Sequence, residues 1–162
     1  MKKIISISLL AFLIDRISKI IITSLLKKGE SIIIIKNFFS LTLAKNTGVA
    51  FSLLEGKTIF IILITILILF LLFEIIKKEQ KKKEEVICYS IIIGSALGNL
   101  FDRLIYGYVI DFLDFKIFNY NYPIFNLADS CIVIAVFILI VIDFKEKEKH
   151  HENSSRKKLK NW

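Results

Sequence analysis

The sequence predicts a small all-α membrane protein of four transmembrane helices, with a short β-element between the first and second helix. Hydrophobic residues make up 55% of the 162 residues, above the roughly 45–50% of ordinary soluble domains. The mean hydropathy is +0.64. Several stretches also approach the length of about 20 apolar residues that a helix needs to cross a bilayer. The predicted spans cover residues 4–26, 58–76, 86–101 and 124–142.

The distribution of lysine predicts the orientation of these spans. An even number of spans places both termini on one side of the membrane. Lysines gather in residues 2–3, 77–83 and 145–160, which all fall on that side. Because positively charged loops face the cytoplasm, both termini are predicted to be cytoplasmic. The same placement accounts for the net charge of +8, and no aromatic residue except Trp162 interleaves the basic runs, so a nucleic-acid partner is not predicted.

The first span begins like a secretory signal peptide, with Lys2 and Lys3 before an apolar run. No cleavage site with small residues follows. Instead Asp15, Arg16 and Lys19 interrupt the run, and apolar character then resumes. We therefore predict an uncleaved first span. Asp15 and Lys19 are four residues apart, so they share a helix face and are expected to pair.

The outward segment after this span differs in composition. Residues 31–36 and 38–43 are rich in β-branched and aromatic side chains, and turn residues follow at 45–48. This pattern predicts a β-element over residues 31–54, on the outer side of the membrane. Its apolar residues fit two interpretations equally: an interfacial platform that rests on lipid or on a lipid-bearing ligand, and a packed cap.

Two stripes of polar residues are predicted, one on the third span and one at the outer end of the fourth. Residues spaced three and four apart share one face of a helix. The stripes consist of Ser95, Asn99, Asp102 and Arg103, and of Asn126, Asp129 and Ser130. The small residues Gly94, Ala96 and Gly98 would let the third and fourth helices approach closely. We expect the stripes to meet at the outer membrane boundary.

Five acids are candidates for chemistry: Asp15, Asp102, Asp111, Asp114 and Asp129. Acids inside a membrane protein persist mainly for function. Asp15 and Asp102 have cations close by in the sequence, which favours structural roles for them, although chemistry at Asp102 stays open. Asp111 and Asp129 lack such neighbours, apart from Lys116 near Asp111, and are the better candidates for acid–base chemistry.

Two carboxylates brought together share a proton, which predicts an aspartic-protease mechanism. Zinc hydrolysis lacks histidine outside the tail, and a serine nucleophile lacks a histidine base, while a serine–lysine pair remains an alternative by residue type. Cys88 and Cys131 lie in apolar segments and predict neither a disulfide nor a metal site. The residues alone leave open a hydrolase, a small four-span proton-coupled transporter and an assembly factor.

Five motifs in order resemble the bacterial lipoprotein signal peptidase family, signal peptidase II. They are Asp15-x-x-x-Lys19 and the segments 46–51, 98–103, 107–112 and 125–130, and the resemblance covers residues 9–143. It implies an aspartyl endopeptidase of the bacterial inner membrane that removes signal peptides from diacylglyceryl-modified prolipoproteins, on the N-terminal side of the lipidated cysteine. It also implies no metal or other cofactor, and inhibition by globomycin-type cyclic peptides. We expect a monomer in contact with membrane lipids.

The resemblance also assigns roles to single residues. It maps the catalytic pair onto Asp111 and Asp129. The substrate-binding positions are Asn46, Asn99, Arg103 and Asn126, and the structural positions are Asp15, Lys19 and Asp102. Ser95 stands where the family often has glycine, and Arg16 where glutamine is common. Residues 1–144 are predicted to form the peptidase domain, and residues 145–162 a disordered basic tail on the cytoplasmic side.

Overall fold

The computed structural model describes residues 2–49, 53–78, 82–118 and 120–160, with side chains described up to Lys149. Ala50 and Phe51, which belong to one of the family motifs, and the neighbouring Ser52 lie outside the described residues. The elements are α1 (Lys2–Leu25), β1 (Ser31–Ile35), β2 (Phe39–Asn46), α2 (Thr58–Lys78), α3 (Lys83–Tyr106), β3 (Val109–Ile117), β4 (Tyr120–Asn121) and α4 (Leu127–Lys160).

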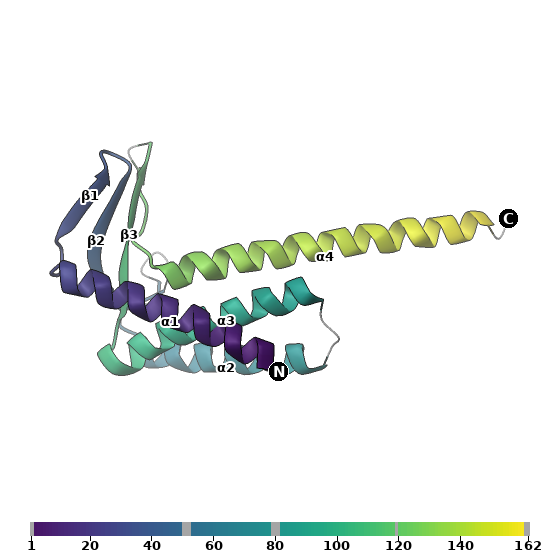
Figure 1. Ribbon diagram of the computed structural model, residues 1–162, viewed down its shortest axis with the longest axis horizontal. Helices are drawn as coiled ribbons and strands as arrows, with labels where there is room; N and C mark the ends of the chain where they lie inside the picture. Colours follow the sequence, from purple (N-terminus) through teal and green to yellow (C-terminus); the bar gives the residue numbers. More distant parts are fainter. Residues whose placement is uncertain (1, 50–52, 79–81, 119, 161–162) are drawn as a thin grey trace.

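The helices form a bundle with α3 at its centre, packed against α1, α2 and α4. Of the described helices, α2, α3 and α4 are long and apolar enough to cross a membrane. The chain is therefore a multi-pass membrane protein. The remaining helix, α1, has 24 residues and carries charged side chains both at its N-terminus and in its C-terminal half. In Figure 1 the sheet stands at the end of the bundle where α1 and α3 end and α4 begins.

The sheet is larger than predicted. It has four antiparallel strands in the order β1-β2-β3-β4, whereas the prediction placed the β-element only between the first two helices. The segment after α3, for which no β-element was predicted, supplies β3 and β4. Its first four residues, 109–112, are all buried. Because both faces of the strand are covered there, its sequence lacks the apolar–polar alternation that marks a strand with one exposed face.

A small apolar core joins the sheet to the bundle. It consists of Ile22 and Leu26 at the end of α1, Leu43 on β2, and Ile110 and Phe112 on β3. Ile110 and Phe112 flank Asp111, so this core holds the strand segment around Asp111 against the helices. Burial of such side chains stabilises each of them by about 1.5–3 kcal/mol.

Two helices run further than predicted. α3 continues to Tyr106 and ends at Gly107, whose positive φ of 78° suits glycine, so Asp102 and Arg103 lie within the helix. α4 begins at Leu127 and continues to Lys160, through the tail for which disorder was predicted. One contact that favours helix there is the Asp143–Lys147 ion pair, four residues apart, with 2.7 Å between Oδ2 and Nζ.

The prediction that small residues of the third span face the fourth was wrong for its glycines. A Cβ at Gly94 would collide with the backbone carbonyl of Ser8, and one at Gly98 with the carboxylate of Asp15. Both partners belong to α1. Sequence periodicity shows that Gly94 and Gly98 share a face of α3, but the identity of the facing helix follows only from the tertiary fold.

Gly94→Ala is therefore expected to destabilise the protein by about 1–3 kcal/mol, the usual effect of overpacking. A loss of stability is informative, because alanine is a better helix former than glycine and would otherwise stabilise α3. The midpoint of thermal unfolding in detergent measures the effect. Leu97→Ala, at an exposed position of the same helix, should change stability much less. A Gly94→Ala protein as stable as the parent would contradict the close approach of α1 and α3.

Candidate active site

Asp111 on β3 and Asp129 on α4 contact the same residue, Asn126. The side-chain Nδ2 of Asn126 donates to Asp111 Oδ1 at 2.7 Å. Its backbone N–H donates to Asp129 Oδ2 at 3.2 Å. Two acids that are 18 positions apart in the sequence are thus held at one site by the residue that precedes α4.

Asn126 also starts α4. Its Oδ1 accepts the backbone N–H of Asp129 at 3.0 Å, while Asp129 accepts the backbone N–H of Asn126 in return. This reciprocal pair is a capping box, with aspartate at the position usually held by glutamate. The side chain of Asn126 is fully buried. Asp129 is therefore fixed in the first turn of the helix, with one carboxylate oxygen bound to the main chain.

Asn99 on α3 binds the other oxygen of Asp129. Its Nδ2 donates to Asp129 Oδ1 at 2.8 Å. Its own Oδ1 accepts from Lys19 Nζ at 2.9 Å and from Asn126 Nδ2 at 3.1 Å. Because two donors face the amide oxygen, the amide nitrogen must face Asp129. The predicted polar stripes of α3 and α4 do meet, through these contacts.

Asn46, at the end of β2, binds the second oxygen of Asp111. Its Nδ2 donates to Asp111 Oδ2 at 2.8 Å, and its Oδ1 accepts the backbone N–H of Gly48 at 2.9 Å. Burial and the nearby Asp129 carboxylate raise the pKa of Asp111 to about 7, against the opposing effect of the hydrogen bonds from Asn46 and Asn126. Asp111 therefore exchanges its proton near neutral pH, as an acid–base catalyst requires.

Arg103 lies in the last turns of α3 and connects this helix to the loop after β2. Its Nη2 donates to the backbone carbonyl of Gly48 at 2.7 Å. Its Nε is buried and has no hydrogen-bond partner within the part of the chain that the structure describes. A buried donor without a partner is unfavourable, which makes Nε available to an acceptor that enters the site.

A group of four buried charges lies beside these side chains. Lys19 Nζ is 2.8 Å from Asp15 Oδ2 and 2.8 Å from Asp102 Oδ2, and Arg16 forms an ion pair with Asp102. The predicted Asp15–Lys19 pair is confirmed. Arg103 is the cation next to Asp102 in the sequence, but the cations that bind Asp102 come from α1. The importance of Arg16 was missed, although an extra cation inside a span signals the need for an acidic partner.

Asp114, the remaining candidate acid, lies apart from this network. It sits on β3 opposite Ser40 and accepts a hydrogen bond from Thr42 Oγ1 at 2.7 Å. No contact links it to Asn99 or Asn126 among the described residues. Asp114 thus serves as an internal comparison for Asp111 on the same strand.

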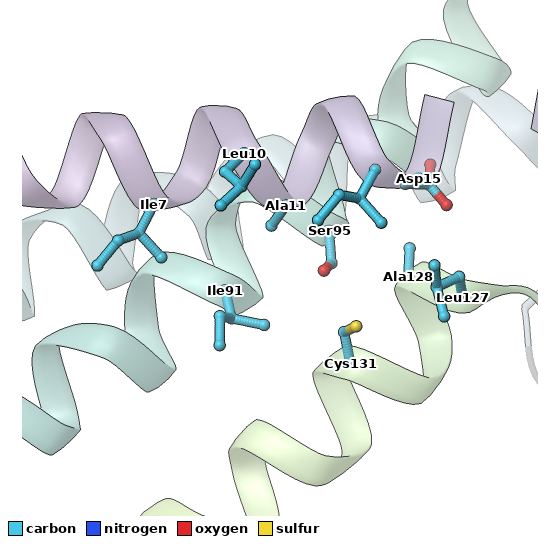
Figure 2. Close-up of a pocket in the computed structure, with 10 residues that line it drawn as sticks. Ile7, Leu10, Ala11, Asp15, Ile91, Ser95, Leu127, Ala128 and Cys131 are labelled. Carbon is cyan, nitrogen blue, oxygen red and sulfur yellow. The ribbon is translucent and has the colours of Figure 1, made fainter. Parts of the chain in front are cut away.

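A separate apolar cavity of about 230 Å³ lies between α1, α3 and α4 (Figure 2). It is lined by Ile7, Leu10, Ala11, Ile14, Asp15, Ile91, Ser95, Leu127, Ala128 and Cys131. Neither Asp111 nor Asp129 lines this cavity, so the polar site is distinct from it. Ser95, the departure from the family's glycine, has its hydroxyl toward this space in Figure 2.

The described residues contain no group of three or more His, Cys, Asp or Glu side chains placed to hold a metal ion. The side chains of the site are two carboxylates that are hydrogen-bonded to three asparagines. One acid with a pKa near neutrality beside a second acid supports proton transfer in both directions.

Comparisons with known proteins agree on one family. The model of the family described as signal peptidase (SPase) II matches residues 7–145. Lipoprotein signal peptidase of Halothermothrix orenii is 38% identical over 86% of this chain and 94% of its own length. The protein of the same name from Staphylococcus aureus is 37% identical over 90% of both chains.

Two solved structures, each described as a bacterial membrane enzyme, share the fold. The first has a TM-score of 0.84 at 36% identity and covers 92% of both chains. The second has a TM-score of 0.78 at 37% identity, over 88% of this chain and 92% of its own. The chain therefore belongs to the signal peptidase II family of membrane proteases.

Proposed function

We propose that the chain is an intramembrane aspartyl endopeptidase that removes the signal peptide from diacylglyceryl-modified prolipoproteins. Cleavage falls on the N-terminal side of the lipidated cysteine, and Asp111 and Asp129 are the catalytic pair. The observation that carries this proposal is the contact of both carboxylates with Asn126, in a chain whose relatives are lipoprotein signal peptidases. The alternative of a proton-coupled transporter is not supported by these relatives.

The proposed mechanism uses one proton shared by the pair. One carboxylate is ionised and takes a proton from a water molecule, whose oxygen attacks the scissile carbonyl carbon. The other, protonated acid donates its proton to the carbonyl oxygen. The proton taken from water then passes to the leaving amine as the C–N bond breaks. As the C=O bond reforms, a hydroxyl proton of the tetrahedral intermediate returns to the second acid, so the pair again holds one proton. The proton count belongs to the pair, because neighbouring carboxylates titrate together.

We assign substrate binding to Asn46, Asn99, Arg103 and Asn126. Their amide and guanidinium donors suit the carbonyl oxygens of a peptide backbone and of lipid esters. The Nε of Arg103, which has no partner among the described residues, supports this assignment. Globomycin-type cyclic peptides, which also present backbone carbonyls, are expected to compete for the same donors.

We further propose that α1 is a fourth transmembrane span and that both termini are cytoplasmic, in the inner membrane. The charged residues in the outer half of α1 are paired with each other and with Asp102, which lowers the penalty for placing them in a bilayer. The peptidase domain is then residues 1–144, as a monomer. Residues 145–162 form its basic cytoplasmic extension.

The exposed strand β1 supports contact between the sheet and membrane lipids. Ile32, Ile33, Ile34 and Ile35 are all exposed, which a packed cap would not show. Apolar side chains grouped at a surface are typical of a site that meets a membrane or an apolar ligand. We therefore favour the interfacial platform over the packed cap for this strand.

Purified protein incubated with a diacylglyceryl prolipoprotein tests the function. The expected result is a shortened product whose new N-terminus is the lipidated cysteine, and no product in the presence of globomycin. The same precursor without the lipid serves as the control for substrate class. Acid-dependent flux into vesicles without any cleaved product would instead indicate a transporter.

The pH dependence of cleavage gives a further prediction. Because Asp111 has a pKa of about 7, the singly protonated pair is lost as pH rises through this value, and kcat/KM should fall there. The Asn46 hydrogen bond favours ionised Asp111, so Asn46→Ala should raise the pKa and move this alkaline limb to higher pH. A pH profile of kcat/KM measures the shift.

Thr42→Val is the matched control for this shift. Thr42 also lies on β2, but its hydroxyl binds Asp114 rather than Asp111. The alkaline limb of this variant should stay where it is in the parent protein. A limb that moves to lower pH in Asn46→Ala, or moves equally in both variants, would show that it does not report on Asp111.

A further inference from the structure

Arg16 and Asp102 form a buried pair between α1 and α3. The guanidinium of Arg16 binds Asp102 Oδ1, and its Cζ lies 4.6 Å from the centre of the Phe101 ring. Arg16 is 9% exposed and Asp102 is fully buried. The planar guanidinium is thus fixed by an ion pair and by an aromatic face at once.

The other oxygen of Asp102 reaches the strand that carries Asp111. Asp102 Oδ2 accepts the backbone N–H of Ile110 at 3.2 Å and lies 2.8 Å from Lys19 Nζ. Ile110 directly precedes Asp111 on β3. Asp102 therefore links α1 to β3. Together with the pairing of β3 with β2, its orientation helps to set where the first residues of the strand lie.

On the other side β3 pairs with β2, with Lys45 opposite Ile110 and Ala44 opposite Asp111. Asp111 is also held through its side chain. Its two oxygens bind Asn46 and Asn126, and both of these partners depend on the main chain of Asp111 staying in place. If Asp102 lost Arg16, its Oδ1 would lack a partner and the carboxylate could rotate away from the Ile110 N–H. A displacement of about 1 Å at a reacting group can reduce the rate about 10²-fold.

We propose that Arg16 and Asp102 are positioning residues that hold β3, and through it Asp111, in the arrangement needed for proton transfer. This inference rests on the proposed function of Asp111. Neither residue belongs to the set to which we assign substrate binding. Their effect should therefore appear in kcat, with KM unchanged, and it should depend on the pair rather than on the charge of either partner alone.

A double-mutant cycle of Arg16→Gln, Asp102→Asn and the combined variant tests the pair. Asp102→Asn should lower kcat about 10²-fold with KM unchanged, because the new amide N–H₂ would face either Arg16 or the Ile110 N–H. Arg16→Gln should lower kcat less. In the combined variant the new glutamine carbonyl can accept from the new asparagine amide. This contact frees the asparagine oxygen for the Ile110 N–H, so kcat should recover above that of Asp102→Asn alone.

Asp15→Asn is the matched control, since Asp15 pairs with the same Lys19 but makes no contact with β3 among the described residues. It should lower thermal stability and leave kcat per folded enzyme unchanged. The folded amount is measured for each variant by size-exclusion chromatography and thermal unfolding. If Asp102→Asn does not fold, the kcat per folded enzyme of Arg16→Gln still tests the inference. This variant is expected to fold, because glutamine is common at this position in the family.

Two outcomes would overturn the inference. One is a loss of activity that follows only the folded amount in all variants, with kcat per folded enzyme unchanged. The other is a combined variant whose fold-loss of kcat equals the product of the two single fold-losses, because the two residues would then act independently. Absence of cleavage by the parent protein is a different result, which would overturn the proposed function itself.

Discussion

Replacement of Asp111 or Asp129 by asparagine is expected to abolish cleavage of a lipidated precursor, with a loss of at least about 10²–10⁴-fold in kcat. An amide has the shape of the carboxylate but can neither take a proton from water nor give one to the scissile carbonyl. With one acid replaced, the two side chains can no longer share a proton. The protein should remain folded, because a neutral amide is less costly to bury than a carboxylate.

Asp114→Asn is the control for this prediction. Asp114 lies on the same strand as Asp111 and accepts one hydrogen bond from Thr42, but it has no part in the contacts of Asn126. Its variant should cleave at close to the parent rate. The assay follows product formation by electrophoresis at matched amounts of folded enzyme. If Asp111→Asn kept near-full activity, the catalytic assignment would be wrong and Asp102 would be the next acid to test.

Much of the helical framework could be predicted from the sequence, because apolar runs of membrane length are local signals. The meeting of the polar stripes was also predictable from spacing, and Asn99 does bind Asp129. The capping box formed by Asn126 and Asp129 is likewise readable, as an asparagine three residues before an acid at the start of an apolar run.

The rest depends on which elements pack together, and local patterns do not contain that information. β3 was not predicted as a strand, because its first residues are buried on both faces and show no alternation. The glycines of α3 were predicted to face α4 but face α1, because a helix face of small residues does not indicate which helix packs against it. Arg16 was treated as a detail because Asp102, the acid it binds, is 86 residues away in the sequence.

Asn126→Ala is expected to have the second largest effect, about a 10²-fold loss of kcat, the size typical of a misplaced reacting group. Asn126 supplies both an N–H to Asp111 and the cap that orients Asp129, so alanine releases both acids at once. Loss of the cap should also lower the free energy of unfolding by about 0.5–2 kcal/mol. Ser130→Ala, whose hydroxyl donates only to the backbone carbonyl of Asn126, should change either quantity little.

Asn126→Ser separates the two roles of this residue. Serine is a good N-cap and can still accept the Asp129 N–H, but it lacks the amide N–H₂ that reaches Asp111 and Asn99. If the link between the acids matters for catalysis, this variant should be nearly as stable as the parent and nearly as inactive as Asn126→Ala. Thermal unfolding and kcat measured on one preparation decide the question. Recovery of activity together with stability would mean that Asn126 acts through the helix cap alone.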